Sequence, residues 1–252
     1  MKKQIVLGIF AFFGAMLILA FANSNFNTSD LPKDDSLEVK VDTIEDNNYP
    51  SVKIGGQKWM TENLNVDKFR NGDPIPEAQS ESEWKKAGED SQPAWCYYDN
   101  YPANGGIYGK LYNWFAVNDP RGLALEGWHV PSDGEWTVLT EYLGGKEIGE
   151  IINGIPFWYT PSAGGKMKST GTQYWKSPNK DATNSSGFSG LPGGLRGYRG
   201  GFVYVGNAGG WWSSSELNAN KAWTRTLGCY GGSVDRGHYS RSSGLSVRCL
   251  RD

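Results

Sequence analysis

Residues 127–145 read GWHVPSDGEWTVLTEYLGG, a stretch that predicts a strand leading directly into a capped helix. Residues 128–130 have the aromatic and β-branched character of a strand end, and Pro131 stops the strand because it lacks a backbone N–H group. Ser132 stands three residues before Glu135, which is the spacing of a capping box. In this motif each side chain satisfies a backbone N–H group at the start of a helix, so a helix is expected to begin here.

The predicted helix has one apolar face and ends at glycine. Trp136, Leu139 and Leu143 recur at intervals of three and four residues, as in an amphipathic helix. Asp133 lies in the first turn, where the helix dipole favours negative charge, and residues 144–145 are glycines that suit a C-terminal cap. Capping and packing account for the polar residues of this stretch, so we interpret it as a scaffold and not as a site.

Residues 1–22 have the composition of a secretory signal peptide. Lys2 and Lys3 precede an apolar run over residues 5–20, and residues 20–22 (AFA) have the small-x-small form of a cleavage site. The alternative is a retained transmembrane anchor, because the run approaches the length that spans a bilayer. We therefore predict an exported protein, secreted, periplasmic or on the cell surface, that contacts a membrane only if this segment is not cleaved.

The next segment, residues 23–48, is polar and acidic and predicts a flexible linker before a folded domain at residues 49–252. The formal net charge of the chain is −2, and loss of the two lysines of the signal peptide makes it −4. A mildly acidic protein without a basic block is a poor binder of nucleic acid, so no nucleic-acid partner is expected.

The composition favours a loop-rich domain that is largely β. The sequence has 34 glycines, 11 tryptophans and 13 tyrosines, of which glycine suits tight turns and tryptophan fills cores. The three cysteines, Cys96, Cys229 and Cys249, leave one unpaired and leave the pairing of any disulfide open. Their spacing does not match a metal cluster, so we predict no metal and no cofactor.

Short hairpins and helices are expected in the first half of the domain. Residues 51–64 (SVKIGGQKWMTENL) alternate in polarity around a Gly-Gly pair and predict a β-hairpin. Ser80 opens a second capping box, with Trp84 as a buried anchor, so a short helix is expected over residues 80–88. Residues 107–117 are dense in aromatic side chains and fit either a strand or a helix.

The second half is expected to consist mostly of strands. Residues 148–155 could continue a short helix, and residues 164–190 form a polar, loop-like excursion. From Leu191 onward, short apolar segments separated by glycines predict antiparallel strands. A last strand at residues 248–250 is expected to be central in its sheet.

Six motifs occur in an order that resembles a known family. They are VKIGGQKWMTENL, YGKLYNW, GWHVPSDGEW, SGFSGLPGGLRG, WWSSSE and SVRCLRD. Together they resemble the Fibrobacter succinogenes major paralogous domain (FISUMP), which is widespread in exported proteins of Bacteroidetes, and the resemblance covers roughly residues 45–252. Many members have a Cys-Pro before the GWHVP motif, whereas residues 123–126 here read LALE, so a disulfide from that position cannot form.

The same segments are also similar to the sulfatase-modifying-factor and C-type-lectin-like fold. HVPSDGEW is similar to that family's RLPTEAEW, and GLSVRCLRD to its GFRCARD ending. This resemblance implies an α+β fold: a C-type-lectin-like, loop-rich domain with short antiparallel strands and about two helices. It also implies that the N- and C-terminal strands pair and that long loops lie on one side.

No catalytic residue is predicted. Formylglycine-generating relatives use a close pair of late cysteines to bind copper, whereas Cys229 and Cys249 have 19 residues between them. The loop motifs of calcium-dependent lectins do not occur. Cys229 and His238 offer a nucleophile and a base, but a lone Cys and His in a glycine-rich hairpin are more often structural. Carboxylate pairs for glycoside hydrolysis depend on a geometry that a sequence does not display.

Aromatic residues among glycine, serine and asparagine are the candidates for ligand binding, because flat rings stack on sugar faces. The candidates are Trp175, Tyr198, Tyr204, Trp211 and Tyr230. The competing interpretation is that these rings fill the core, and exposure of several of them on one face would distinguish the two.

We therefore expect a secreted or cell-surface binding module without catalytic activity, whose ligand is an extracellular carbohydrate or a protein. Two alternatives remain. One is an extracellular enzyme that uses the loop face of a sulfatase-modifying-factor-like fold, and the other is a purely structural surface protein.

Overall fold

The computed structural model describes residues 49–152 and 154–252. The predicted signal peptide (1–22) and linker (23–48) lie outside the described residues. In the part that is described, no helix is both long and apolar enough to cross a membrane.

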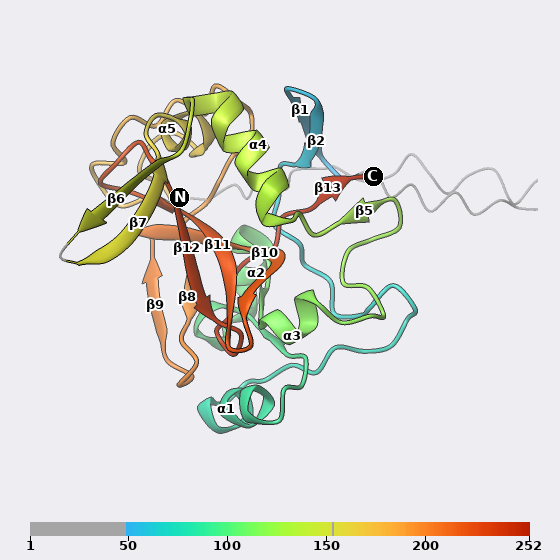
Figure 1. Cartoon of the computed structure of the whole chain (residues 1–252). Helices are drawn as coiled ribbons and strands as arrows, with labels where there is room; N and C mark the ends of the chain where they lie inside the picture. The colour runs from blue at the N-terminus through green and yellow to red at the C-terminus, as the bar shows by residue number, and fades with distance from the viewer. Residues whose placement is uncertain (1–48, 153) are drawn as a thin grey trace, which may run out of the picture. The chain divides into compact units, whose positions relative to one another are not determined.

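Short strands and short helices alternate along the described chain, which confirms the predicted α+β class (Figure 1). The strands are β1 (Ser51–Ile54), β2 (Gln57–Met60), β3 (Trp95–Cys96), β4 (Leu111–Tyr112), β5 (Trp128–His129), β6 (Ile148–Ile152), β7 (Ile155–Thr160), β8 (Gly193–Arg196), β9 (Phe202–Val205), β10 (Ala208–Asn218), β11 (Lys221–Gly228), β12 (Val234–Ser240) and β13 (Leu250–Arg251). The helices are α1 (Glu81–Glu89), α2 (Gly105–Tyr108), α3 (Trp114–Val117), α4 (Asp133–Gly144) and α5 (Ala163–Met167), with 3-10 turns η1 (Tyr98–Asn100) and η2 (Pro102–Asn104).

The number of helices differs from the expected two. Helices α1 and α4 have nine and 12 residues and are the two that the capping boxes predict. The described chain adds α2, α3 and α5, each of four or five residues. A single helical turn is too short to show a periodic apolar face, which is why the sequence did not predict these three.

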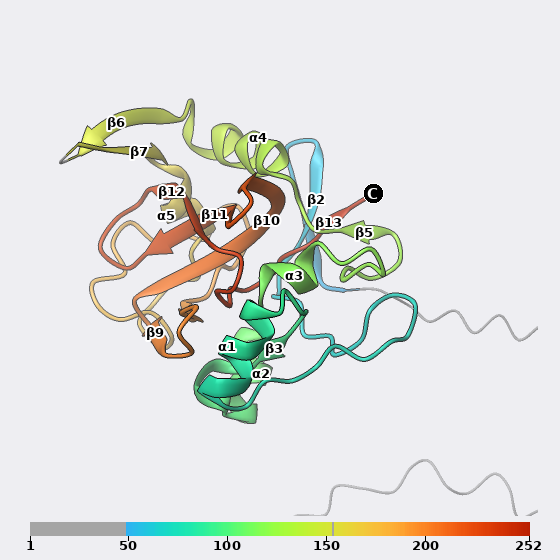
Figure 2. The ribbon, with the colours of Figure 1, turned by 60° about the horizontal axis from the view of Figure 1, so that its bottom comes forward.

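Seven strands form the larger sheet, in the order β6-β7-β12-β11-β10-β8-β9. Neighbouring strands are antiparallel except for β8 and β10, which are parallel at Gly194 and Gly209. Figure 2 shows β10, β11 and β12 side by side, with α4 near one end of β10. The strands expected after Leu191 therefore form, with one parallel exception.

A four-stranded sheet, β1-β2-β13-β5, joins the two ends of the domain. Strand β13 lies between β2 and β5, because Leu250 pairs with Trp59 on one side and with His129 on the other. The last strand therefore pairs with the second strand of the N-terminal hairpin, as expected for the N- and C-terminal strands, and its central place is confirmed. A further two-stranded sheet consists of β3 and β4.

The capping box of α4 forms as predicted. The Ser132 Oγ atom accepts a hydrogen bond from the Glu135 N–H group at 3.2 Å, and the Glu135 carboxylate accepts one from the Ser132 N–H group at 2.8 Å. Trp136, Leu139 and Leu143 are buried on the inner face of the helix. Ser80 caps α1 in the same way, and Trp84 is buried as expected.

Asp133 has a second role that its position in the first turn does not predict. Its carboxylate forms ion pairs with Arg225 on β11 and Arg236 on β12, each with an N···O distance of 2.6 Å. Arg225 is almost completely buried. Asp133 therefore joins the start of α4 to the larger sheet.

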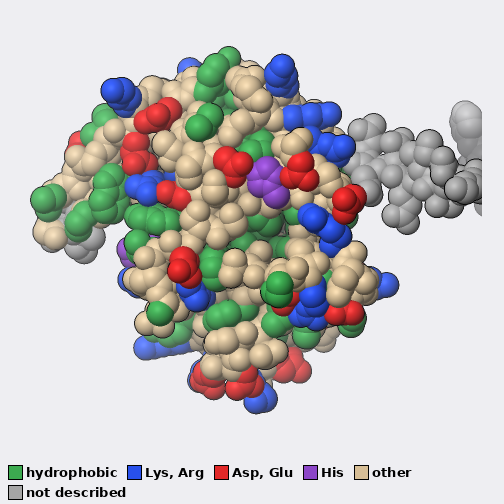
Figure 3. Space-filling model, turned by 45° about the vertical axis from the view of Figure 1, so that its right-hand side comes forward, with side chains coloured by type: hydrophobic (Ala, Val, Ile, Leu, Met, Phe, Trp, Pro, Cys, Tyr) green, Lys and Arg blue, Asp and Glu red, His purple; other side chains and the backbone are tan. Residues whose placement is uncertain are grey.

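The prediction of a helix at residues 148–155 is wrong. This segment forms β6 and the start of β7, which pair in a hairpin whose turn contains Gly154 at a φ of +79°. β-branched isoleucines favour extended backbone, and a glycine with positive φ suits a tight turn. The hairpin projects from the body of the domain in Figure 1, and hydrophobic side chains are visible on it at the left of Figure 3.

Tryptophan rings form much of the core. In one buried cluster, the Trp59 and Trp136 ring centroids are 4.7 Å apart, and Phe188 and Trp211 pack against Trp136. A second large cluster includes Trp212, Leu245, Val247 and other side chains between α3 and the sheets. These clusters keep the long loops in fixed positions around the sheets.

A buried lysine holds two of these loops together. The Lys168 Nζ atom donates hydrogen bonds to the carbonyl oxygens of Lys180, Gly228 and Gly231 at 2.7, 3.0 and 2.8 Å. Irregular loops leave carbonyl groups without strand or helix partners, and a buried ammonium group satisfies three of them at once.

Candidate functional site

Two of the five aromatic candidates for ligand binding are core residues. Trp175 and Trp211 are each 1 % exposed. The Trp175 indole N–H group donates to Gly190 O at 3.1 Å, and that of Trp211 donates to Asn63 Oδ1 at 2.8 Å. A tryptophan whose ring is packed and whose N–H group is satisfied inside the protein has nothing left for a ligand. For these two residues the competing interpretation, core packing, is correct.

The other three candidates are exposed but do not share a pocket. Tyr198, Tyr204 and Tyr230 are 51, 54 and 72 % exposed. Tyr198 follows β8, Tyr204 lies on β9, and Tyr230 lies in the turn between β11 and β12. Tyr198 lines a cavity of about 310 Å³ with Arg199 and Lys85, and neither of the other two tyrosines lines it. The structure therefore does not assemble these tyrosines into one patch.

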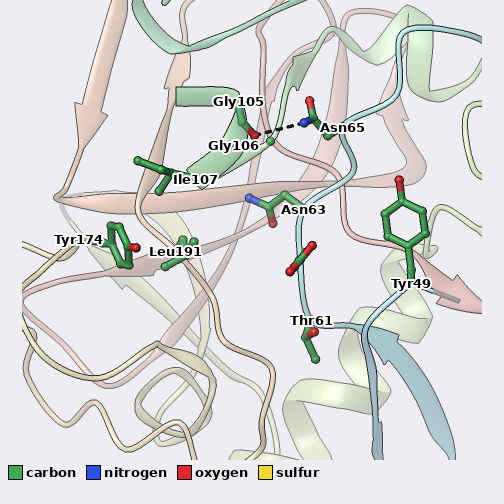
Figure 4. Close-up of a pocket in the computed structure, with 11 residues that line it drawn as sticks. Tyr49, Thr61, Asn63, Asn65, Gly105, Gly106, Ile107, Tyr174 and Leu191 are labelled. Carbon is green, nitrogen blue, oxygen red and sulfur yellow. Dashed lines mark hydrogen bonds between the residues drawn. The ribbon is translucent and has the colours of Figure 1, made fainter. Parts of the chain in front are cut away.

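A larger and more polar pocket lies beside the segment that follows β2 (Figure 4). Its volume is about 430 Å³, within the range of roughly 300–1,000 Å³ typical of small-molecule sites. Four parts of the chain line it: the residue Tyr49 before β1, the segment after β2, helix α2 with its flanks, and two residues of the long loops. The lining residues are Tyr49, Thr61, Glu62, Asn63, Asn65, Gly105, Gly106, Ile107, Gly109, Tyr174 and Leu191.

Asn63 forms a rigid part of the pocket lining, because both its side-chain oxygen and its side-chain nitrogen are hydrogen-bonded to the protein. Its Oδ1 atom accepts hydrogen bonds from Trp211 Nε1 at 2.8 Å and from the Arg248 guanidinium at 2.8 and 3.2 Å. Its Nδ2 atom donates to Tyr108 O at 2.8 Å. The Asn63 side chain therefore supports the pocket, with its oxygen and one of its two N–H groups bonded to the protein.

Arg248 lies behind this lining and is completely buried. Its guanidinium group donates to Asn63 Oδ1 and to the carbonyl oxygen of Phe188, whose ring centroid is 4.2 Å away. Burial lowers the pKa of Arg248 to about 9, against the opposing effect of the Glu62 carboxylate. The guanidinium is thus held by neutral oxygens and a ring, and it contacts the pocket through Asn63.

The side of the pocket around Asn65 is also held by hydrogen bonds. Asn65 Nδ2 donates to Gly105 O at 3.2 Å, a bond that Figure 4 shows. The Lys110 Nζ atom donates to both Asn65 O and Asn65 Oδ1 at 3.0 and 3.1 Å. The same ammonium group lies 4.3 Å from the centroid of the Trp95 ring, so Lys110 is committed to the protein.

Four polar side chains of the pocket remain free. Among the described residues, no hydrogen-bond partner is found for the Tyr49 hydroxyl, the Thr61 hydroxyl, the Glu62 carboxylate or the Tyr174 hydroxyl. Tyr174 is positioned by an edge-to-face contact with Tyr108, at 6.3 Å between ring centroids. Figure 4 shows Tyr174 and Tyr49 on opposite sides of the pocket, with Asn63 between them. A firmly held lining thus carries hydroxyl and carboxylate groups that are available to a ligand.

Comparison with known families supports the resemblance of the six motifs. A model described as the Fibrobacter succinogenes major domain matches residues 52–251. The chain belongs to this family. All of the pocket's lining residues except Tyr49 lie within this Fibrobacter succinogenes major domain. Searches of curated proteins and of solved structures found no match.

The cysteines of this Fibrobacter succinogenes major domain are buried and free. Cys96, Cys229 and Cys249 form no disulfide. Burial raises the pKa of the Cys96 and Cys249 thiols to about 12, which keeps both protonated at neutral pH. Among the described residues there is no group of three or more His, Cys, Asp or Glu side chains that could hold a metal ion.

The side chain of His129 contacts two carboxylates from other parts of the fold. Its Nδ1 atom is 2.7 Å from the Asp252 carboxylate and its Nε2 atom is 2.9 Å from the Glu135 carboxylate. Because Glu135 also completes the capping box, these three side chains link β5, α4 and the residue after β13. The interpretation of the GWHVPSDGEW stretch as a scaffold agrees with these contacts.

The sequence interpretation did not identify the pocket residues as candidates. Thr61, Glu62, Asn63 and Asn65 belong to the TENLN segment, which was assigned to a hairpin strand. One feature of the sequence could have identified them: this strongly polar run directly follows a buried strand. Polar residues in such a position often have a function besides contact with solvent. Tyr174 carried no such signal, because only the fold of the long loop places it opposite Tyr49.

Proposed function

We propose that this domain is a non-catalytic, extracellular binding module with a C-type-lectin-like fold, and that it binds carbohydrate in the pocket beside Glu62. One observation carries the proposal: a single cavity is lined by four residues whose hydroxyl or carboxylate groups have no hydrogen-bond partner among the described residues, whereas the amides of Asn63 and Asn65 are held by the protein. The α+β fold and the pairing of the N-terminal hairpin with the last strand are compatible with the lectin-like relation.

The chemistry of the pocket suits a polyhydroxylated ligand. Sugar hydroxyl groups can donate to the Glu62 carboxylate and exchange hydrogen bonds with the hydroxyl groups of Tyr49, Thr61 and Tyr174. Tyrosine rings at opposite sides can contact the apolar faces of a sugar ring. Because Asn63 is fixed by Arg248 and Trp211, little ordering of the lining is needed on binding, which favours affinity.

The pocket favours binding over glycoside hydrolysis. Hydrolases of this kind use two carboxyl groups about 5–9.5 Å apart, one on each side of the scissile bond. Among the residues that line this pocket, Glu62 is the one with a carboxylate. A carboxylate without a catalytic partner is suited to accept hydrogen bonds from a bound sugar.

The test is a glycan array with the purified full chain, followed by calorimetry on the glycans that bind. We expect Glu62→Gln and Tyr174→Ala each to weaken binding by about tenfold or more, since each removes a group that faces the ligand. Glu81→Gln, an exposed carboxylate outside the pocket, serves as the matched control. An array without any bound glycan, or pocket variants that bind as the wild type does, would contradict the proposal.

The projecting β6–β7 hairpin favours a protein partner as a second candidate. Ile151 is 77 % exposed, and β6 is the edge strand of the larger sheet, with no strand beyond it among the described residues. An open strand edge with apolar side chains can pair with a strand of another protein. Ile151→Lys should abolish such an association, as measured by pull-down from extracellular extracts, and leave glycan binding intact.

A further inference from the structure

The lining of the pocket carries a negative charge, whereas the nearby positive charges are hydrogen-bonded to other residues of the protein. Glu62 is the one charged side chain among the lining residues. Two cations are nearby, but both are committed: Lys110 donates to Asn65, and Arg248 donates to Asn63 and Phe188. A ligand that enters the pocket therefore meets a free carboxylate and no free cation.

The tyrosine rings of the pocket attract positively charged groups, as this carboxylate does. Tyr49 and Tyr174 lie on opposite sides of the cavity (Figure 4), and the faces of tyrosine rings attract cations within about 6 Å of the ring centroid. Their hydroxyl oxygens can also accept hydrogen bonds from an ammonium group. The lining thus offers an ammonium group one charge-assisted acceptor and several weaker ones.

We propose that the pocket selects sugars that carry a free amino group, such as glucosamine units, over their N-acetylated counterparts. This inference rests on the proposed carbohydrate-binding function and adds the chemical class of the ligand. A protonated amine donates three hydrogen bonds and pairs with the Glu62 carboxylate. An acetamido group is neutral and leaves that carboxylate without a partner charge.

The experiment compares two β-1,4-linked oligosaccharides of equal length, one of glucosamine and one of N-acetylglucosamine. Both are titrated into the full chain at mildly acidic pH, where the amine is protonated and glutamate is ionised. We expect the amine form to bind at least about fivefold more tightly, since a hydrogen bond between charged groups is stronger than one between neutral groups. Glu62→Gln should remove this preference, because it weakens binding of the amine form more than it weakens binding of the acetylated form.

Two controls separate a specific site from general attraction to an acidic protein. Glu81→Gln removes an exposed charge elsewhere and should keep the preference for the amine. A lysine oligopeptide of equal length carries the charge without the sugar and should bind more weakly than the glucosamine oligomer. Because Glu62→Gln also removes the carboxylate that opposes the lowering of the Arg248 pKa, the melting temperature of this variant is measured alongside, and binding is compared below it.

The outcomes distinguish this inference from the function on which it rests. Equal or tighter binding of the acetylated form, with binding lost in Tyr174→Ala, overturns the amine selectivity and retains the carbohydrate-binding function. A preference for the amine that survives Glu62→Gln, or equal binding of the lysine peptide, also overturns the inference. Failure of both oligosaccharides to bind overturns it too, and the glycan array then decides the function separately.

Discussion

His129 is the residue whose charge state matters most for local structure. Both of its ring nitrogens are within hydrogen-bond distance of a carboxylate, Asp252 on one side and Glu135 on the other. A neutral imidazole has one N–H group and can donate to one of them, whereas the imidazolium form donates to both. The geometry therefore favours the protonated ring.

This arrangement predicts a pH dependence of stability. Partial burial lowers the pKa of His129, but the hydrogen bonds to Asp252 and Glu135 outweigh it, so the pKa is raised above its ordinary value. A raised folded-state pKa stabilises the protein below the unfolded-state pKa of about 6.5, and the effect is lost as pH rises through the folded-state pKa. Because the ring is about one-third exposed, the expected contribution is a few tenths of a kcal/mol.

The measurement is urea unfolding of the wild type and of His129→Asn between about pH 6 and pH 9. The advantage of the wild type should shrink as pH rises. His238→Asn, at an exposed histidine without a carboxylate partner among the described residues, should show no such trend. An advantage of the wild type that grows with pH would contradict this account.

At the scale of elements, helix α4 depends on one aspartate. Asp133 forms ion pairs with Arg225 and Arg236, and so holds the N-terminal end of the helix against β11 and β12. Burial raises the pKa of the Asp133 carboxyl, but the two arginines outweigh it and hold the pKa below its ordinary value. Asp133 and its two arginine partners are therefore charged throughout the neutral pH range.

Asp133→Asn should lower the free energy of unfolding by about 3 kcal/mol, because it leaves the buried Arg225 guanidinium without a counter-charge. Chemical unfolding at neutral pH measures this loss. Glu141→Gln, an exposed change on the same helix, should cost less than about 0.5 kcal/mol. Equal stability of the two variants would show that the ion pairs do not hold the helix in place.

Elements differ in how well the sequence predicts them. Helices α1 and α4 have capping boxes and buried tryptophans, so their positions follow from local pattern. The β6–β7 hairpin was expected to be a helix, because a short apolar run does not distinguish the two structures and pairing with β12 decides between them. The capping role of Asp133 was predicted, but its ion pairs were not, since Arg225 and Arg236 are about a hundred residues away in sequence.

At the scale of the whole molecule, buried cations hold the loops in place. Lys168 donates to three carbonyl oxygens in two separate loops, and Arg196 donates to Ala78, Ser80 and Gly200. These bonds connect segments that no sheet joins. The loops that accept these bonds are thereby tied to the rest of the domain.

Lys168→Met should test this role, because it keeps the length and apolar stem of the side chain and removes the ammonium group. We expect a loss of about 3 kcal/mol in the free energy of unfolding, since three buried carbonyl groups lose their partner. Thermal and urea unfolding measure it, with Lys180→Met at an exposed position as the control. A variant as stable as the wild type would show that water replaces the ammonium group at no cost.

Local patterns alone determined the family, the α+β class and the two capped helices, whereas the pairing of the terminal strands followed from the family resemblance. Capping, periodicity and turn chemistry act between residues that are close in sequence, and the six ordered motifs carry the family signal. Tertiary structure decided that Trp175 and Trp211 belong to the core, and that Tyr49, Glu62 and Tyr174 meet at one pocket. Burial and convergence depend on contacts between distant segments, and the type of a single residue does not specify those contacts.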